Sequence, residues 1–270
     1  MTKCPKKTRL DLHLLTKGLA QSRHQAQLLI RAGKVRDLQG KLLDKPGMLV
    51  SNELEVFVKE ASRFVSRGGE KLFAALEEFP LKIQGRICLD AGISTGGFTD
   101  CLFQHGAALV YGIDVGYGQI AWKLRQDPKL ILKERTNLRK LTPIELYGPE
   151  DPKPSFAVAD LSFISLRMVI PSIKALLATQ NSELVLLVKP QFEVGRDRVG
   201  KGGVVRDFKA HIDALNSVID SASCSGFFPN GLLASPITGP AGNHEYLLWL
   251  GSRKVDNFPL IEELVRNTLA

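Results

Sequence analysis

Two charged residues at the ends of apolar segments could take part in a reaction. Lys189 follows the apolar run of LVLLVKP (184–190), and Asp160 follows that of SFAVADL (155–161). Such runs are typical of strands that are buried on both faces of a parallel sheet. The carboxyl ends of these strands face the ligand crevice in open α/β sheets. Each charge alone is more often a solvated strand end, but an ammonium and a carboxylate that open on one crevice could act together on a substrate.

A glycine-rich turn offers a place for a cofactor beside these charges. In LDAGISTGGFTD (89–100) the glycines let the backbone approach a ligand, and the helix that follows offers free N–H groups. A dinucleotide site would need glycine where Ser94 stands, and the ending GK[ST] of a phosphate-binding loop is absent. S-adenosylmethionine has no phosphate, and Asp114, about 20 residues on, could accept both hydroxyls of its ribose. A tight turn without a ligand fits less well with Asp90 before the turn and Asp114 after the next strand.

The segments that must position these residues alternate between strands and helices. Five apolar strand candidates are separated by helix-length segments, and they lie at 86–91, 108–114, 130–134, 155–161 and 184–190. This alternation predicts an α/β fold with a parallel sheet covered by helices on both faces. The C-terminal stretches FFPNGLLASPI and EYLLWLG could add a hairpin-like pair of strands.

The net charge of +8 is concentrated at one end of the 270-residue chain. Residues 1–67 hold 14 Lys or Arg against 6 Asp or Glu, whereas residues 68–270 hold 22 of each kind. A small basic domain beside a neutral one indicates a polyanionic partner, most simply nucleic acid. An anionic membrane surface is less consistent, because the basic residues do not lie opposite one long apolar face.

The cysteine spacing favours a reducing compartment, and the N-terminal segment does not have the pattern of a signal peptide. The four cysteines are far apart and form no CxxC pair: Cys4, Cys88, Cys101 and Cys224. This spacing argues against a zinc site and a disulfide framework. The segment MTKCPKKTRLDLH has no apolar stretch behind its basic residues, and no run approaches the roughly 18 apolar residues of a membrane span. We therefore expect a cytoplasmic protein that binds no membrane and requires no metal.

The basic N-terminal part is predicted to contain two helices, followed by short strands in VRD (35–37), LLDKPGMLV (42–50) and ELEVFV (53–58). Helical spacing marks 9–18, and a second helix is expected between the N-cap Ser22 and Gly33. This part resembles the alpha-L RNA-binding domain of a small-subunit ribosomal protein over about residues 8–58. The resemblance implies contacts with structured RNA. The residues that it assigns to RNA binding are Arg9, Ser22, Arg23, Gln27 and Lys34. We expect this domain over 1–58, a polar linker over 59–70 and a second domain over 71–270.

The second domain resembles the Rossmann-like, FtsJ-like ribose 2′-O-methyltransferases, and more narrowly the TlyA type. The matching motifs include VSRGGEKL, LDAGISTGGFTD, YGIDVGYGQIAWKLR, ERTNLR, ADLSFISL, LVKPQFEVGR, KGGVVRD and SPITGPAGNHEYL. The family is described as methylating rRNA cytidines from S-adenosylmethionine, and many members carry the label haemolysin. The resemblance implies that the methionine end of the cofactor is lined by Asp90, Gly92, Ser94, Gly96, Gly97 and Phe98. It further implies that Asp114 binds the ribose and that Asn137 lies near the adenine.

FtsJ-like enzymes use a Lys-Asp-Lys-Glu tetrad, and the resemblance implies that all four members are present here. The matching residues are Lys71, Asp160, Lys189 and Glu245. We assign Lys189 to orient and activate the 2′-hydroxyl, Asp160 to fix Lys189, and Lys71 with Glu245 to hold the ribose. Whether Lys189 acts as a base or only as an orienting group stays open at this point, because a base would need a lower pKa than free lysine has.

The segment that follows Lys189 could form a lid. FEVGRDRVGKGGVVRD (192–207) has four glycines, and its acidic residues offset much of its basic charge, so a plain solvated loop is the alternative. We expect a mobile lid that contacts RNA through Arg196, Arg198 and Lys201. Three other functions are weighed against the methyltransferase: a non-catalytic RNA-binding or ribosome-assembly factor, a membrane-lytic haemolysin, and a pseudouridine synthase. The complete tetrad disfavours the non-catalytic factor, and the lack of a membrane segment disfavours the haemolysin. The glycine turn disfavours the pseudouridine synthase.

Overall fold

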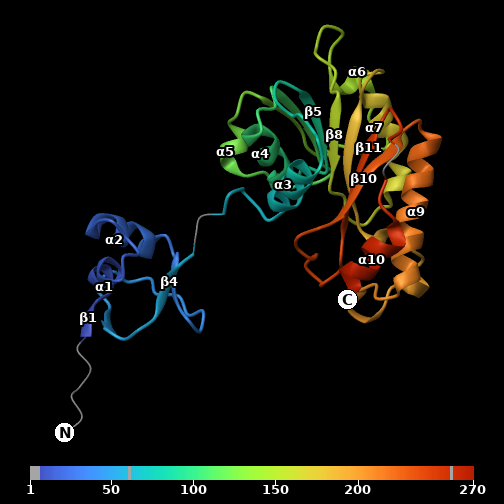
Figure 1. The fold of residues 1–270 in the computed structure, drawn as a ribbon. Coiled ribbons are helices and arrows are strands. Elements are labelled where there is room, and N and C mark those ends of the chain that lie inside the picture. The colour runs from blue at the N-terminus through green and yellow to red at the C-terminus, as the bar shows by residue number, and fades with distance from the viewer. Residues whose placement is uncertain (1–6, 60–61, 256–257) are drawn as a thin grey trace. The chain divides into compact units, whose positions relative to one another are not determined.

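The computed structural model describes residues 7–59, 62–255 and 258–270 and divides into two compact units. Unit 1 is Met1–Ser62 and unit 2 is Arg63–Ala270. Each has its own hydrophobic core (Figure 1). Each unit is described by itself below.

Unit 1 packs two short helices against two small antiparallel sheets. β1 pairs with β3, and β2 pairs with β4. The elements are β1 (Lys7–Arg9), α1 (Leu10–Thr16), α2 (Arg23–Arg31), β2 (Val35–Asp37), β3 (Leu49–Ser51) and β4 (Val56–Val58). Leu10, Leu14 and Ile30 are fully buried, so each helix packs one apolar face against the core. Helix α2 begins as predicted, because the Ser22 side chain accepts a hydrogen bond from the Gln25 N–H.

Unit 2 is built on one seven-stranded sheet in the order β10-β11-β9-β8-β5-β6-β7. Its strands are β5 (Ile87–Ala91), β6 (Leu109–Ile113), β7 (Leu130–Lys133), β8 (Phe156–Ala159), β9 (Glu183–Val188), β10 (Phe228–Ala234) and β11 (Tyr246–Gly251). Strands β5 to β9 are parallel, whereas β11 runs antiparallel to both β9 and β10. The predicted parallel sheet and the predicted C-terminal hairpin are both confirmed.

Helices cover both faces of this sheet, as the strand pattern predicts (Figure 1). They are α3 (Gly68–Glu78), α4 (Gly97–Gln104), α5 (Trp122–Arg125), α6 (Pro143–Leu146), η1 (Leu166–Met168), α7 (Ile170–Leu176), α8 (Pro190–Glu193), η2 (Arg196–Arg198), η3 (Lys201–Gly203), α9 (Phe208–Cys224) and α10 (Ile261–Leu269). Alternate strand residues point to opposite faces. Cys88 of β5 joins the core with α3 and α4, while its neighbour Leu89 joins the core with α7 and α9. The strands are therefore buried on both sides, which explains their continuous apolar runs.

The strand order places a crevice at the carboxyl ends of β5, β8 and β9. From β5 the chain builds outward through β6 to β7, then crosses back to β8 on the other side of β5. A reversal of this kind leaves a crevice at the carboxyl edge, where ligands bind in open α/β folds. The antiparallel β11 starts at the same edge, because its register pairs Tyr246 with Val188 of β9.

Two features of the chain differ from the sequence expectations. The strand expected within 42–50 forms only an isolated bridge at Leu42 and the three residues of β3. The linker expected over 59–70 overlaps unit 2: Phe64 is buried in the core beside Gly69, and α3 begins at Gly68. A missing side chain at Gly69 leaves the space that the Phe64 ring fills, so this polar-looking segment is packed. Residues 60–61 of the expected linker lie outside the described residues.

Within the described ranges no helix has the length and apolarity needed to cross a bilayer.

Candidate active site

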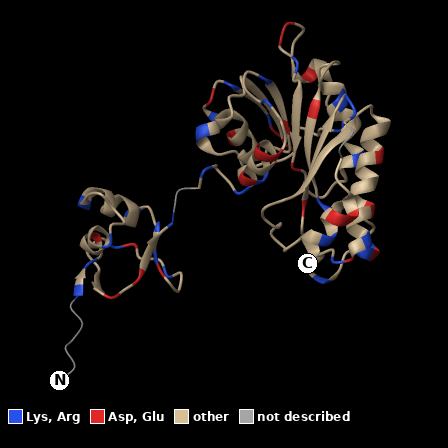
Figure 2. Cartoon of the chain, in the orientation of Figure 1, with Lys and Arg blue, Asp and Glu red and all other residues tan. Residues whose placement is uncertain are grey.

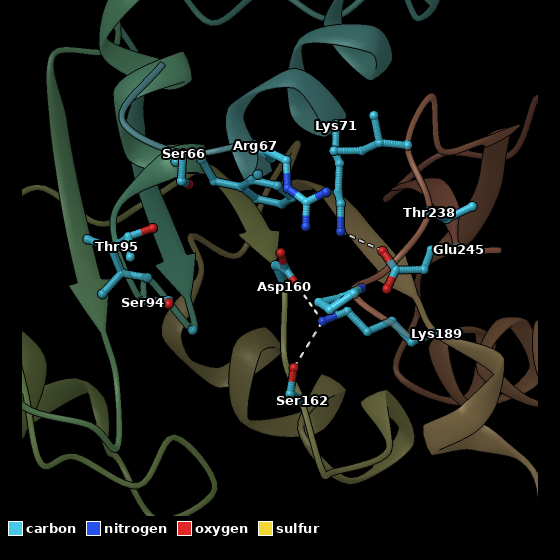
Figure 3. A pocket seen from close by; sticks show the side chains of 17 residues that line it. Ser66, Arg67, Lys71, Ser94, Thr95, Asp160, Ser162, Lys189, Thr238 and Glu245 are labelled. Atoms are coloured by element: carbon cyan, nitrogen blue, oxygen red, sulfur yellow. Dashed lines mark hydrogen bonds and ion pairs between the residues drawn. The ribbon is translucent and has the colours of Figure 1, made fainter. Parts of the chain in front are cut away.

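A pocket of about 470 Å³ opens where β5, β8 and β9 end, and it gathers charged side chains from four segments (Figure 3). The glycine turn after β5 forms one wall, and the start of α3 forms another. Residues after β8 and β9 form the floor, and the segment before β11 closes the far side. All four residues of the predicted tetrad line this one pocket.

Lys189 and Asp160 form the first ion pair of the pocket. Lys189 follows β9 and Asp160 follows β8, which are neighbouring parallel strands. Lys189 Nζ lies 2.5 Å from Asp160 Oδ1 and donates a second hydrogen bond to Ser162 Oγ at 3.1 Å. The side chain of Lys189 is 9% exposed and that of Asp160 is 25% exposed. The sheet edge therefore brings the two charges together as the strand pattern predicts.

Lys71 and Glu245 form the second ion pair, which is buried more deeply. Lys71 Nζ, from α3, lies 2.5 Å from Glu245 Oε2. The Glu245 side chain is only 2% exposed. Glu245 directly precedes β11 and Lys189 directly follows β9, so the pairing of Tyr246 with Val188 brings both ion pairs to the same strand ends.

The two buried ion pairs contribute little to the stability of the fold. Removing four charged groups from water costs more than two ion pairs usually return, so buried pairs are weak contributors to stability. Their benefit is a fixed position for each ammonium. Such a lysine can hold an uncharged hydroxyl in place by hydrogen bonding while its carboxylate balances the charge.

The glycine turn lies against the tetrad because of close backbone packing. Gly92 has a φ of 89°, and a Cβ there would lie 2.8 Å from the carbonyl oxygen of Asp160. A Cβ on Gly97 would lie 2.8 Å from the Gly69 backbone nitrogen. Only glycine allows β8 and α3 to approach the turn this closely. Helix α4 begins at Gly97, and its first N–H groups lack partners in the helix.

A second hollow of about 350 Å³ continues from the first and contains Asp114. Gly92, Ser94, Asp160 and Ser162 line both hollows. The Asp114 carboxylate accepts the Ser94 N–H at 2.8 Å and the Gly116 N–H at 2.7 Å. Ser94 has a φ of 48°, a left-handed conformation that this hydrogen bond helps to hold. A carboxylate offers about four acceptor sites, so Asp114 keeps capacity for further donors.

Three residues predicted to line the cofactor site lie outside both hollows. Asn137 caps its own turn, because its side-chain oxygen accepts the Arg139 N–H at 3.1 Å. Gly96 packs against the side chains of α5. Asp90 is fully buried in β5 and accepts the Thr99 hydroxyl at 2.7 Å. Ser94, Gly92, Gly97, Phe98 and Asp114 do line the hollows.

Asp90 differs from the tetrad because it has no cationic partner among the described residues. Burial raises the pKa of Asp90 to about 7. Its second oxygen, Oδ1, has no hydrogen-bond partner among residues 7–59, 62–255 and 258–270. The nearby carboxylate of Asp160 also raises this pKa, whereas the Thr99 hydrogen bond lowers it. Asp90 is therefore held inside the fold by Thr99, and its role in binding the cofactor stays a prediction.

Sequence reasoning missed several residues that line the pocket. Figure 3 shows the Arg67 guanidinium directed into the pocket beside Lys71. Arg67 precedes Lys71 by four residues at the start of α3, and this spacing could have indicated a shared helix face. Ser162 lies two residues beyond Asp160 and binds Lys189. Phe163 lines the second hollow, has a φ of 64° and is 92% exposed.

The three loop residues predicted to contact RNA do not join the pocket. Arg198 binds Asp213 at 2.7 Å and Asp207 at 2.8 Å, so its charge is balanced within the chain. Asn243 ties the loop down, because it accepts the Val205 N–H and donates to the Gly203 carbonyl. Arg196 and Lys201 are exposed on η2 and η3. The loop expected to be a mobile lid therefore has several fixed contacts.

In unit 1, three of the predicted RNA-binding residues share one partner. Arg9, Arg23 and Gln27 each donate to the buried carboxylate of Asp11. Ser22 caps α2, and no side-chain contact holds Lys34 within the described ranges.

The described residues contain no cluster of metal-ligating side chains. Cys88, Cys101 and Cys224 are free thiols, and Cys4 lies outside the described residues.

Comparisons with known proteins agree with this division into two parts. Residues 64–252 match the FtsJ-like methyltransferase family, and residues 8–56 match the S4 domain. The chain is 48% identical over 247 residues to the 16S/23S rRNA (cytidine-2′-O)-methyltransferase TlyA of Mycobacterium tuberculosis, covering 91% of this chain and 90% of that protein. Hemolysin A of Brachyspira hyodysenteriae is 40% identical over 240 residues, covering 88% of this chain and 98% of that protein.

A solved structure supports the same relationship. A hemolysin-named protein from Streptococcus thermophilus aligns with a TM-score of 0.73 and 40% identity, covering 98% of this chain and 96% of that one. Identity at this level over nearly the full length reflects a shared fold and a shared family. The chain therefore belongs to the FtsJ-like methyltransferase family and, with its S4 domain, to the TlyA-type proteins within it.

Proposed function

We propose that this protein transfers a methyl group from S-adenosylmethionine to the ribose 2′-hydroxyl of a cytidine in ribosomal RNA. The observation that carries the proposal is the meeting of two lysine–carboxylate pairs beside a glycine turn in one pocket. The nucleobase and the rRNA substrate follow from the activity that the TlyA relative's name states.

The two connected hollows fit the methyl donor. The close backbone approach at Gly92 and Gly97 leaves room for its amino-acid end, next to the N-terminus of α4. Asp114 in the second hollow keeps acceptor capacity for the ribose hydroxyls. When bound, S-adenosylmethionine supplies a methyl group that its sulfonium has already activated. Thr136 and Leu138 flank the same hollow and replace Asn137 as the residues nearest the base.

Lys189 is proposed to orient the target hydroxyl. An ammonium has three donors, and Asp160 and Ser162 engage two of them. The third remains for the 2′-oxygen, so the hydroxyl is held with a fixed direction before it reacts. Lys71 and Glu245 are proposed to hold the sugar from the other side of the pocket. Asp90 is proposed to support the glycine turn through its hydrogen bond with the Thr99 hydroxyl of α4.

RNA binding is proposed to begin with unit 1. This unit carries the S4 match and several Lys and Arg residues on β1 and α2 (Figure 2). Arg9, Arg23, Gln27 and Lys34 are proposed to contact the RNA backbone, whereas Ser22 maintains α2. In unit 2, Arg196 and Lys201 are free to contact RNA, whereas Arg198 braces the loop.

The proposal is tested by methyl transfer from radiolabelled S-adenosylmethionine to ribosomal subunits that lack the modification. Wild type is compared with Lys189→Ala and with Lys129→Ala, an exposed lysine outside both hollows. We expect alkali-resistant label at one cytidine with wild type and Lys129→Ala, and none with Lys189→Ala. Cofactor binding without transfer to either subunit or to free rRNA would contradict the proposed substrate. Absence of both cofactor binding and methyl transfer in the wild type would instead favour a non-catalytic RNA-binding factor.

A further inference from the structure

One carboxylate in unit 1 accepts hydrogen bonds from three side chains and one backbone N–H. Asp11, in the first turn of α1, is 0% exposed. Arg9 donates from Nε at 3.1 Å and from Nη2 at 3.0 Å, so it binds both carboxylate oxygens. Arg23 Nε donates at 3.1 Å and Gln27 Nε2 at 3.0 Å, both to the same oxygen, Oδ2. The Leu12 N–H donates to the other oxygen at 3.0 Å.

These contacts fix two guanidinium groups next to each other. Arg9 Nη2 and Arg23 Nε share one acceptor oxygen, so the two groups lie within hydrogen-bonding distance of a common atom. The side chain of Arg9 is 43% exposed and that of Arg23 is 52% exposed. Arg9 keeps Nη1 free of Asp11, and Arg23 keeps both of its Nη groups free of it. The planar fork of arginine matches the oxygens of a phosphate when its orientation is fixed.

The burial of Asp11 argues that its role is to set geometry. An exposed carboxylate on an RNA-binding surface would repel phosphate. Here the two arginines cover it, and their hydrogen bonds hold the pKa of Asp11 well below its usual range, so it stays ionised. Two guanidiniums over one carboxylate still leave one net positive charge facing outward. The arginines are ordered before RNA arrives, so binding does not have to immobilise them.

We propose that Asp11 is a positioning residue that holds Arg9 and Arg23 together as a site for one RNA backbone phosphate. The inference deepens the proposed function, on which it rests, by naming the residue that organises the RNA-binding surface of unit 1. Gln27 completes the arrangement by binding the same carboxylate oxygen as Arg23 from one helical turn further along α2.

The sign of one substitution separates this role from simple electrostatics. Asp11→Asn removes a negative charge, so charge alone would strengthen binding to RNA. A positioning role predicts the opposite, because the amide no longer binds both arginines as an anion. We expect the Kd of the full-length protein for unmodified ribosomal subunits to rise about tenfold at fixed salt, because one backbone phosphate is no longer held. In methyl transfer the effect should appear in KM for the subunits and not in kcat.

Two further variants keep the test decisive if Asp11→Asn fails to fold. Arg9→Lys and Arg23→Lys keep the charge and leave Asp11 in place but remove the fork. Each should weaken binding severalfold, whereas Arg253→Lys, an exposed arginine after β11 in unit 2, should not. Asp11→Glu should restore part of the affinity that Asp11→Asn removes. A folded Asp11→Asn protein that binds as tightly as wild type, or unchanged binding by both lysine variants, would overturn the inference. Failure of wild type to bind subunits would instead count against the proposed function.

Discussion

The pocket of unit 2 and the Asp11 cluster of unit 1 arrange their charges differently. Within the tetrad each lysine has its own carboxylate, so two positive charges face two negative ones, and Arg67 adds a further positive charge to the pocket. In unit 1 a single carboxylate serves two arginines and leaves one positive charge in excess. A reaction at an uncharged sugar hydroxyl needs fixed donors with little net field. Attraction of a polyanion needs net positive charge at the surface.

Asp11 of unit 1 and Asp90 of unit 2 also differ in their charge, although both are buried. Asp11 and Asp90 are both 0% exposed. Arginine hydrogen bonds lower the pKa of Asp11, whereas desolvation raises that of Asp90 to about 7. Burial alone therefore does not set the charge of a carboxyl group. The partner decides it.

The largest expected effect comes from Lys189. Lys189→Ala should lower kcat by about 10²–10⁴, because the variant lacks an oriented catalytic group. The KM for ribosomal subunits should change little, in contrast to Arg23→Ala in unit 1. Single-turnover methyl transfer with both variants checks this. A pocket variant that acts only on KM would remove the functional distinction between the two regions.

The next effect concerns the unequal burial of the two ion pairs. Glu245→Gln leaves Lys71 buried without its partner and should cost about 3–5 kcal/mol in the free energy of unfolding. Asp160→Asn should cost less, because Asp160 is 25% exposed and Glu245 only 2%. Urea denaturation of both variants, with the exposed Glu150→Gln as control, measures the difference.

A double variant sharpens this prediction. Lys71→Met with Glu245→Leu removes both buried charges and should regain most of the stability without regaining methyl transfer. Equal stability of the Glu245→Gln and Asp160→Asn proteins would show that burial does not distinguish the pairs.

The pH dependence of stability should have opposite signs for the two aspartates. The folded state raises the pKa of Asp90, so it binds a proton more tightly than the unfolded chain does. Its contribution to stability should decline by up to about 1.4 kcal/mol per pH unit between about pH 4 and 7, then level off. The folded pKa of Asp11 is lowered, so its contribution is present above about pH 4 and is lost as the pH falls below that value.

Unfolding free energies measured across this range test the Asp90 effect. Asp90→Asn should flatten the decline between about pH 5 and 7 relative to wild type. A variant with the same slope as wild type would show that Asp90 is not the titrating group.

The smallest expected effect is at the cap of α2. Ser22→Ala removes the hydrogen bond to the Gln25 N–H and should destabilise unit 1 by about 1 kcal/mol. Amide hydrogen exchange at Gln25 should become faster, while affinity for the methyl donor stays unchanged. Ser223→Ala, an exposed serine of α9, is the control. A decrease of donor affinity in Ser22→Ala would mean that the cap of α2 affects the pocket of unit 2.

The sequence best predicts those site residues that directly follow an apolar strand. Lys189 and Asp160 could be located because a continuous apolar run ends at each, and parallel strands share a carboxyl edge. The pairing of Lys71 with Glu245 has no local signal, since the two residues are 174 positions apart and meet only through the register of β11. Family resemblance supplied that pair.

Other contacts depend on packing that no local pattern reveals. Asp11 looks like an ordinary first-turn acid of a helix, and only the packing of α2 against α1 buries it. Asn137 matches a family motif, yet its side chain caps a turn by accepting the Arg139 N–H. A motif thus places a residue in a segment but does not fix where its side chain points.

Glu245 is the last member of the tetrad along the chain, so the ribosome makes it after Lys71, Asp160 and Lys189. During synthesis the small unit, the glycine turn, Asp160 and Lys189 all emerge before Glu245. Strand β10 contacts the sheet only through β11, so neither strand can join β9 until β11 has been made. Lys71 can form its ion pair with Glu245 only after that point. The second ion pair of the pocket is therefore complete only once the start of β11 has been synthesised and has paired with β9.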